Sequence, residues 1–447
     1  MLKKTFSIIF AALLIAASAI TAGAYEVTGF SLSDSPGLLT SLDTGEILYQ
    51  KDIDQKVYPA SIAKIMTVTL MLESELYNPE GKVTMTKEII DILQGTGSSV
   101  SGLKAGEEIT QLDLLHLVLV SSYGDCAHLA AQIYGGGDEA FVQMMNSKAV
   151  KLGMTKTHYS NPTGLHDPET YTTVRDIWIL AKYALQNETF KAVCGIKRYT
   201  IPATNLSAAR TISTTNFLLD NATNYYYQYA GGVKTGYTDE AGRCLVSTAS
   251  YNGYTYLCIL MNRSPKAPAR LEFSESANLY RWAFNNFSYK QAADSKNPVC
   301  EIPVELSFET DFLPLYLAKS FVAVLPNDAD ESTIVIEPHL KSPSVDAPIK
   351  KGDVLGQADI IYAEQVIGTV DLVAGRDVSS NLLLVVVRAV KRFFGSFYWK
   401  ILLAAAGLAV VIFIAMCIRL NIGRGKKRKV KYKPYNERKE KETNEKH

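Results

Sequence analysis

The chain has 447 residues, about three times the length typical of one domain, so two or three modules are expected. Its composition, 47% hydrophobic and 20% charged with 29 glycines and 16 prolines, excludes a disordered, a collagen-like or a small disulfide-stabilised protein. The formal net charge of +1 indicates neither a nucleic-acid-binding protein nor an acidic, solvating one, but this charge is unevenly distributed along the chain.

The first 24 residues have the pattern of a secretory signal peptide. Lys3 and Lys4 precede an apolar run over residues 6–20, and Ala22-Gly23-Ala24 then forms a small-residue cleavage site. The alternative is an uncleaved membrane anchor, although the run is shorter than a membrane span requires. We expect cleavage after this site and export of the chain that follows it.

A hairpin and several helices are predicted next. Residues 38–50 predict two short strands around Asp43-Thr44-Gly45. A largely buried helix is expected over residues 61–76, because apolar residues dominate this segment and neither Gly nor Pro interrupts it. Farther on, Thr110 resembles a helix N-cap and Asp113 its acidic partner. Helical patterns then lie at residues 111–120, 125–152 and 174–185.

Beyond residue 230 the pattern becomes that of a sheet. Candidate strands lie at residues 231–235, 244–249 and 254–261, and a helix is expected at residues 274–287. Strands, helices and strands again indicate an α+β domain in which helices cover an antiparallel sheet. Asn297-Pro298 marks a boundary, so this domain is expected to span residues 25–296.

Residues 297–385 predict a small all-β domain. Short strand-like segments alternate there with Pro, Asp and Gly, and no repeat of fixed period is found. Residues 386–400 are expected to be a juxtamembrane linker.

A transmembrane helix is predicted at residues 401–418, a run of 18 uncharged, mostly apolar residues. This length crosses about 30 Å of hydrocarbon, and an aromatic cluster at residues 397–399 precedes it. The alternative is a buried core helix, for which polar residues on one face would be expected. Eight basic residues follow within residues 419–433, so the positive-inside rule places the C-terminal tail in the cytoplasm.

The near-zero net charge is a cancellation between two parts of the chain. Residues 419–447 carry 12 Lys and Arg against 4 Asp and Glu, a net +8, and the signal peptide carries +2. Taking both from the total of +1 leaves −9 on the part expected outside the membrane. The basic tail is expected to lie against an anionic inner leaflet and not to bind nucleic acid.

Ser61-Ile62-Ala63-Lys64 is the first candidate catalytic motif. The i, i+3 spacing brings both Cβ atoms to one helix face, about 5–6 Å apart. A lysine desolvated among apolar neighbours has a lowered pKa and can act as the base for a serine nucleophile. Alone this signal is weak, because S-x-x-K occurs by chance in most long chains and is then a surface Ser and Lys.

Lys234-Thr235-Gly236 is the second candidate motif. Gly236 would let a substrate backbone approach a strand edge closely, while Lys234 and Thr235 offer a cation and a hydroxyl to a carboxylate. Gly231 and Gly236 also have the separation of a phosphate-binding P-loop. Tyr237-Thr238 follows in place of Lys-Ser/Thr, which excludes that loop.

Together, the two motifs about 170 residues apart are much more specific than either alone. The chain resembles the low-molecular-mass penicillin-binding proteins that are serine-type D-Ala-D-Ala carboxypeptidases, a peptidase S11-like family. The resemblance covers roughly residues 30–385 and rests on residues 59–67, 122–125, 161–165, 232–238 and 241–242. It implies an α+β fold: a β-lactamase/transpeptidase-like catalytic domain, a small all-β domain and a C-terminal membrane attachment. Family members commonly attach by an amphipathic helix, whereas this chain has a run long enough to span.

The resemblance implies an enzyme that removes the terminal D-alanine of peptidoglycan stem pentapeptides through an acyl-enzyme and that binds β-lactam antibiotics. Ser61 is then the nucleophile and Lys64 its base, while Ser122 relays a proton to the departing D-alanine with help from Lys234. The backbone N–H groups of Ser61 and Tyr237 are expected to form the oxyanion hole. The implied substrate-binding residues are Lys234, Thr235, Gly236, Tyr237 and Arg270.

One position departs from the family pattern. The middle motif of the family is Ser-x-Asn, and here it is Ser122-Tyr123-Gly124. The missing Asn side chain normally holds the lysine and the substrate amide, and losing it could cost about 1–3 kcal/mol, roughly tenfold to a hundredfold in rate. Either Tyr123 or a water substitutes, or the enzyme is slow. The alternative function is therefore a catalytically weak penicillin-binding fold with a wall-binding or structural role.

The sequence offers little support for other hydrolytic mechanisms. The six histidines lack metal-ligand spacing and no G-x-S-x-G motif is present, which argues against a zinc hydrolase and an α/β-hydrolase. A β-lactamase is disfavoured because no motif for its deacylating Glu is found. No cofactor and no metal are expected. Five cysteines lie outside the predicted span at irregular spacing, so no disulfide framework is indicated, although one bridge stays open.

Overall fold

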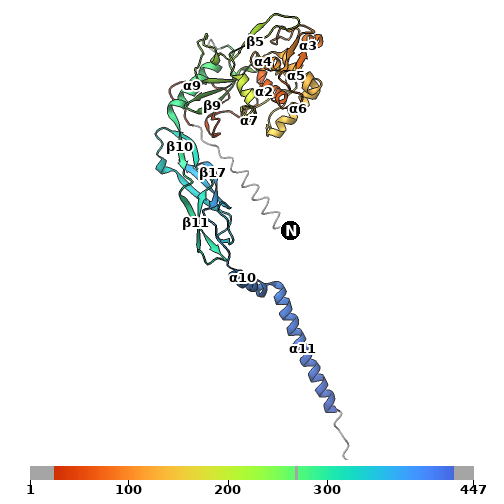
Figure 1. Cartoon of the computed structure of the whole chain (residues 1–447), viewed down its shortest axis with the longest axis vertical. Helices are drawn as coiled ribbons and strands as arrows, with labels where there is room; N and C mark the ends of the chain where they lie inside the picture. Colours follow the sequence, from red (N-terminus) through yellow and green to blue (C-terminus); the bar gives the residue numbers. More distant parts are fainter. Residues whose placement is uncertain (1–24, 267–269, 427–447) are drawn as a thin grey trace, which may run out of the picture. The chain divides into compact units, whose positions relative to one another are not determined.

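The computed structural model describes residues 25–266 and 270–426 (Figure 1). The predicted signal peptide and residues 427–447 of the basic tail lie outside the described residues. The chain divides into two compact units, which we describe separately. The first consists mainly of residues up to Ser295, and the second begins at Lys296 and includes the C-terminal helices.

A five-stranded antiparallel sheet forms the centre of the first unit, with strand order β2-β1-β9-β8-β7. The predicted N-terminal hairpin is confirmed and pairs with a strand more than 200 residues later, Leu39 opposite Cys258. Strand β7 is at one edge of this sheet. The strands are β1 (Gly37–Ser41), β2 (Ile47–Lys51), β7 (Ala230–Thr238), β8 (Gly242–Tyr251) and β9 (Tyr254–Arg263).

Both faces of this sheet are covered, which is why its central strands are almost continuously apolar. Along β9, Leu257 and Ile259 pack into the core shared with the helices on one face. The alternate residues Cys258 and Leu260 pack into a second core, formed with helix α9 (Leu271–Asn286) on the other face (Figure 1). The predicted antiparallel sheet with helices is therefore confirmed.

The helices follow the sequence signals, with differences at their ends. The helix expected over residues 61–76 begins with a 3-10 turn, η1 (Ala60–Ala63), and continues as α2 (Lys64–Glu73). The capping box of Thr110 and Asp113 is present. The other long helices of this unit are α4 (Gln111–Leu119), α5 (Gly124–Gly135), α6 (Asp138–Leu152) and α7 (Val174–Ala184).

The helical pattern predicted over residues 125–152 is confirmed, and the segment forms two helices. Gly136 and Gly137 separate α5 from α6 and have φ angles of 76° and 140°, in the region that glycine adopts without steric cost. Short elements that the sequence patterns did not indicate are α3 (Lys87–Ile92), α8 (Glu188–Cys194), β3 (Lys82–Thr84), β4 (Glu108–Thr110), β5 (Arg198–Ile201), β6 (Arg210–Ser213) and β10 (Phe287–Ala293).

The predicted all-β character of the following segment is confirmed. A six-stranded sheet has the order β14-β16-β17-β12-β11-β15, while β13 (Phe321–Pro326) pairs with β10. The strands of the six-stranded sheet are β11 (Pro298–Glu305), β12 (Phe312–Leu317), β14 (Val335–Leu340), β15 (Val345–Asp346), β16 (Val354–Tyr362) and β17 (Gln365–Ala374).

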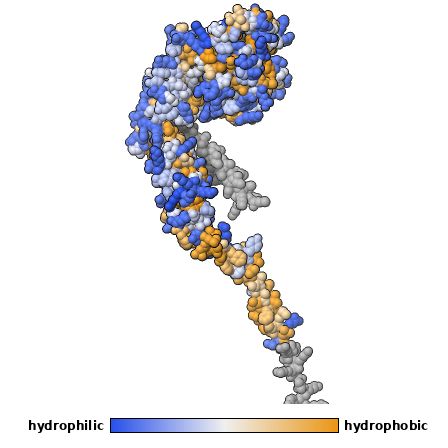
Figure 2. All heavy atoms as spheres, in the orientation of Figure 1, coloured by the Kyte–Doolittle hydropathy of each residue, from blue (hydrophilic) through white to orange (hydrophobic). Residues whose placement is uncertain are grey.

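Two helices end the described chain. Helix α10 (Leu382–Gly395) occupies most of the segment expected to be a juxtamembrane linker. Helix α11 (Phe397–Lys426) contains a stretch, Phe397–Asn421, that is long and apolar enough to cross a membrane. Its apolar side chains are exposed, and Figure 2 shows them as a continuous hydrophobic surface.

Candidate active site

The candidate nucleophile and base lie one helical turn apart. Ser61 is in η1, and Lys64 is the first residue of α2. Lys64 Nζ donates hydrogen bonds to Ser61 Oγ at 2.8 Å and to the Thr163 carbonyl oxygen at 2.7 Å. The Lys64 side chain thus connects the serine to a loop about 100 residues farther along the chain.

The environment of Lys64 favours the neutral amine. The residue is 2% exposed, and burial lowers its pKa to about 7 because desolvation penalises the ammonium. The negative charge of Asp125 opposes this effect by raising the pKa. A pKa near 7 allows the amine to accept a proton at neutral pH.

The loop that contacts Lys64 is held by a side-chain turn. Asn161 Oδ1 accepts hydrogen bonds from the N–H groups of Thr163 and Gly164 and from the Thr163 hydroxyl, at 2.8–3.1 Å. Gly164 has φ +76°, and a Cβ there would lie 1.8 Å from the Ala60 carbonyl oxygen. Glycine is therefore required for the loop to pack against the nucleophile segment. Neither motif pointed to the Thr163 carbonyl, although Asn161-Pro162-Thr163-Gly164 is a turn signal.

Ser122 lies between α4 and α5 with φ 65°, in the left-handed region. A non-glycine residue there is uncommon, and such backbone strain clusters at functional sites. The N–H of the next residue, Tyr123, donates to the Leu117 carbonyl at 3.1 Å and ties this turn to the end of α4. The strained turn brings Ser122 to the same cavity as Ser61.

Edge strand β7 carries the second motif. Lys234 is 1% exposed, and its Nζ donates to the Thr235 carbonyl at 3.0 Å. Burial, and then the like charge of Lys64, lower the pKa of Lys234 well below its ordinary value. Repulsion between the two ammonium groups therefore disfavours the state in which Lys64 and Lys234 are both protonated.

A close approach to the nucleophile segment and a hydrogen bond to the segment before η2 hold β7 in place. A Cβ on Gly236 would lie 3.0 Å from the Pro59 carbonyl oxygen, so the absence of a side chain permits this close approach. The Thr235 hydroxyl is 2.5 Å from the hydroxyl of Thr215, which precedes the short helix η2 (Phe217–Leu219). Thr215 is a cavity residue that neither motif predicted.

Arg270 and Tyr237 occupy more exposed positions. Arg270 Nε donates to Glu272 Oε1 at 2.6 Å, and its guanidinium carbon lies 5.0 Å from the centre of the Phe217 ring. The Tyr237 side chain is 52% exposed, and its hydroxyl donates to Asp239 at 2.5 Å. An ion pair and a cation–π contact thus hold the Arg270 head group in place.

A cavity of about 680 Å³ brings these residues together. Of the eight residues that the sequence predicts for the site, seven line this cavity: Ser61, Lys64, Ser122, Thr235, Gly236, Tyr237 and Arg270. Lys234 is buried. Sequence reasoning missed further lining residues, which include Thr96, Ser98, Ser99, His166, Thr214, Thr215 and Phe217.

Within the described ranges, no group of three or more His, Cys, Asp or Glu side chains could hold a metal ion. All six cysteines lie in the described part of the chain and are unpaired, and Cys126, Cys194, Cys244 and Cys258 are buried. The bridge left open by the sequence is therefore not formed. Burial raises the pKa of the Cys244 thiol, which lines the cavity, to about 12, so it is no thiolate at neutral pH.

Comparison with known proteins gives matches for both parts of the chain. Residues 31–264 match a family model described as D-alanyl-D-alanine carboxypeptidase, and residues 287–380 match one described as penicillin-binding protein 5, C-terminal domain. The chain is 28% identical to D-alanyl-D-alanine carboxypeptidase DacF of Bacillus subtilis over 323 residues, 71% of this chain and 79% of the relative. It is 33% identical to a D-alanyl-D-alanine carboxypeptidase of Streptomyces sp. strain K15 over 269 residues, 58% of this chain and 90% of the relative.

A solved structure has the same fold. Penicillin-binding protein 5 from Haemophilus influenzae superposes with a TM-score of 0.65 at 24% identity. The match covers 79% of this chain and all of that one.

Proposed function

Because the chain belongs to the D-alanyl-D-alanine carboxypeptidase family of serine peptidases, S11, we propose that it removes the terminal D-alanine of peptidoglycan stem pentapeptides through an acyl-enzyme on Ser61. The observation that carries this assignment is the 2.8 Å contact between Lys64 Nζ and Ser61 Oγ at the wall of a cavity. Penicillins acylate the same serine in this proposal.

Acylation begins with Lys64 as the neutral amine. Ser61 Oγ attacks the carbonyl carbon between the two D-alanines while its proton moves to Lys64 Nζ. The Thr163 carbonyl remains a hydrogen-bond acceptor for Lys64 in both protonation states, which keeps the amine oriented. Collapse of the tetrahedral intermediate breaks the C–N bond. Ser122 passes a proton to the leaving amine and takes one from the Lys64 ammonium, which returns to the free amine. Water then hydrolyses the ester and restores Ser61.

The substrate carboxylate and the developing oxyanion have separate partners in this proposal. Lys234, Thr235 and Arg270 bind the terminal carboxylate, whose negative charge favours protonation of Lys234. The backbone N–H groups of Ser61 and Tyr237 hold the oxyanion, and such donors contribute about 3 kcal/mol each to the transition state. The open edge of β7 supports extended binding of a peptide beside it.

Release of D-alanine tests the function. The full-length protein in detergent is incubated with a synthetic peptide ending in D-Ala-D-Ala, and D-alanine is measured. We expect release by wild type, loss of release by Ser61→Ala, and covalent labelling by a fluorescent penicillin in wild type alone. If wild type neither releases D-alanine nor is labelled by the penicillin, the proposal is contradicted.

A second candidate function is favoured by Gly124, which leaves the middle motif without its amide side chain. It is a catalytically weak protein of the same fold that binds the wall. A penicillin-labelled protein that releases no D-alanine would support this alternative. Rapid turnover of penicillin would instead indicate a β-lactamase.

We also propose a single-pass membrane topology, with residues 25–296 and 297–385 as two outer domains and a cytoplasmic tail. The exposed apolar surface of α11 supports the span, and the basic residues after it support the orientation. We expect the full chain to stay in the membrane pellet after a sodium carbonate wash, and a chain ending at residue 396 to be released. Extraction of the full chain by carbonate would contradict the span.

A further inference from the structure

The space that a side chain at position 124 would need is already filled. Gly124 is the first residue of α5, and a Cβ there would lie 2.6 Å from Ser98 Oγ and 2.8 Å from Leu93 Cδ1. Its φ is outside the left-handed region, so sterics and not backbone conformation restrict this position. The absence of the Asn side chain therefore coincides with the presence of a serine hydroxyl at almost the same place.

The loop that carries Ser98 is docked on the start of α5. The Gly124 N–H donates to the Ser99 carbonyl at 2.8 Å. The Asp125 carboxylate accepts hydrogen bonds from the N–H of Ser101, at 3.0 Å and 3.1 Å, and from its hydroxyl, at 2.6 Å. Asp125 is 2% exposed, so these contacts are shielded from water.

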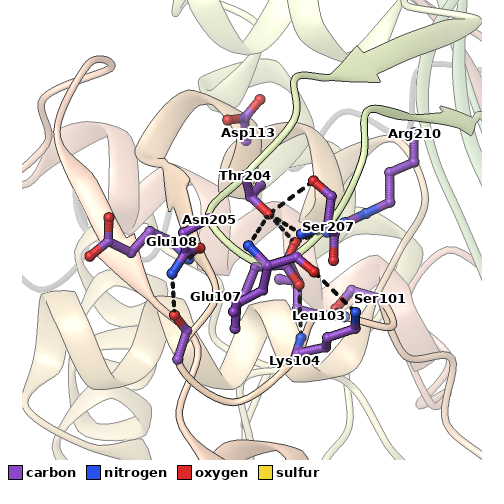
Figure 3. Close-up of polar contacts among 12 residues, drawn as sticks. Ser101, Leu103, Lys104, Glu107, Glu108, Asp113, Thr204, Asn205, Ser207 and Arg210 are labelled. Carbon is purple, nitrogen blue, oxygen red and sulfur yellow. Dashed lines mark hydrogen bonds and ion pairs between the residues drawn. The ribbon is translucent and has the colours of Figure 1, made fainter.

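A second buried carboxylate holds the C-terminal side of the same loop. Glu107 is fully buried and accepts hydrogen bonds from the Lys104 N–H, the Thr204 hydroxyl and Arg210 Nη1, at 2.8–2.9 Å (Figure 3). These contacts join the loop to the segment between β5 and β6. Both carboxylates therefore restrict where Ser98 can lie.

The Ser98 hydroxyl has the properties of a substrate-binding group. It lines the cavity of Ser61 and Lys64. Within the described part of the chain the backbone N–H of Ser98 donates to Thr96 Oγ1, and the hydroxyl makes no hydrogen bond. Lys64 already has two hydrogen-bond partners, Ser61 and the Thr163 carbonyl, which orient it without Ser98. The Ser98 hydroxyl is therefore available to hydrogen-bond a peptide in this cavity.

We propose that Ser98 replaces the missing third side chain of the middle motif and hydrogen-bonds the peptide amide on the N-terminal side of the scissile bond. This inference rests on the proposed function. It identifies a substrate-binding residue on a loop that is separate in sequence from both motifs.

A pair of penicillins tests this role. Benzylpenicillin carries an acylamido side chain equivalent to the substrate amide, and 6-aminopenicillanic acid lacks it. In the full-length protein, Ser98→Ala is expected to slow acylation by benzylpenicillin roughly threefold to tenfold and to leave acylation by 6-aminopenicillanic acid unchanged. The melting temperature should not move, since no internal hydrogen bond is lost. Val100→Ala, an exposed change in the same loop, is the control.

A double-mutant cycle tests the shared space. Gly124→Asn alone is expected to slow acylation by benzylpenicillin about tenfold or more, because its side chain collides with Ser98. Ser98→Ala combined with Gly124→Asn should recover most of that loss, because alanine lacks the oxygen that a side chain at position 124 would meet. Three results would overturn this inference and leave the proposed function intact. They are equal slowing with both penicillins, no slowing in Ser98→Ala, and rate losses that simply multiply in the double variant. Failure of wild type to react with either penicillin would overturn the proposed function as well.

Discussion

The pKa of Lys64 makes a quantitative prediction about the pH dependence of acylation. At 1.36 kcal/mol for each pKa unit, the fall from 10.5 to about 7 corresponds to about 5 kcal/mol against the ammonium form. Roughly half of the Lys64 side chains are then free amine at pH 7, compared with about one in 3,000 at the ordinary value. Without this effect, base catalysis by Lys64 would be negligible at neutral pH.

We therefore expect the second-order rate constant for acylation by a fluorescent penicillin to rise about tenfold between pH 6 and pH 8 and then to level off. The labelled protein is quantified after timed quenching. Lys64→Arg should abolish labelling, because a guanidinium cannot give up its proton in this range. Asp125→Asn keeps an acceptor for Ser101 but removes the charge that raises the Lys64 pKa, so the midpoint should move to lower pH.

A flat profile between pH 6 and pH 8 would refute the reasoning, as would a rise that continues beyond pH 9. The first result would mean that the amine is free throughout. The second would mean that burial does not lower the Lys64 pKa enough. An unmoved midpoint in Asp125→Asn would show that Asp125 does not act on Lys64 electrostatically.

Three further predictions follow from single contacts. Gly164→Ala should lower the free energy of unfolding by about 2 kcal/mol or more and suppress penicillin labelling, because the new Cβ would lie 1.8 Å from the Ala60 carbonyl oxygen. An unchanged stability in calorimetry would contradict this packing. Thr215→Val, which removes the partner of the Thr235 hydroxyl, should reduce kcat/KM for D-alanine release roughly threefold to tenfold, and an unchanged value would exclude a role for that bond. Burial raises the pKa of Glu46 to about 7, so the folded state holds this proton more tightly than the unfolded state and stability should fall as pH rises from about 4.5 through 7. Glu46→Gln, which keeps an acceptor for the Val324 N–H, should therefore gain about 1–3 kcal/mol relative to wild type at pH 8 and little at pH 4, and equal differences at both pH values would contradict the assignment.

Sequence alone determined the features that depend on local order. The apolar helix that contains residues 401–418 follows from a run of apolar residues, and the pairing of Ser61 with Lys64 follows from a three-residue spacing. The central strands and the long helices of the first domain follow from the periodicity of apolar residues, because burial of one or both faces imposes that periodicity. The sequence determined the ends of helices less well. The break between α5 and α6, for example, depends on Gly136 and Gly137 within an otherwise helical pattern.

Only the tertiary structure decided how distant segments complete the site. The Thr163 carbonyl reaches Lys64 across 99 residues, and Thr215 meets Thr235 on a neighbouring element. From the sequence, Gly124 indicates that the hydrogen bonds of the family Asn side chain are lost. In the fold, Ser98 lies in the space beside Gly124. A pattern within one segment carries no record of which other segment packs against it, so the substitution of one side chain by another from a different loop becomes visible only when both are placed in space.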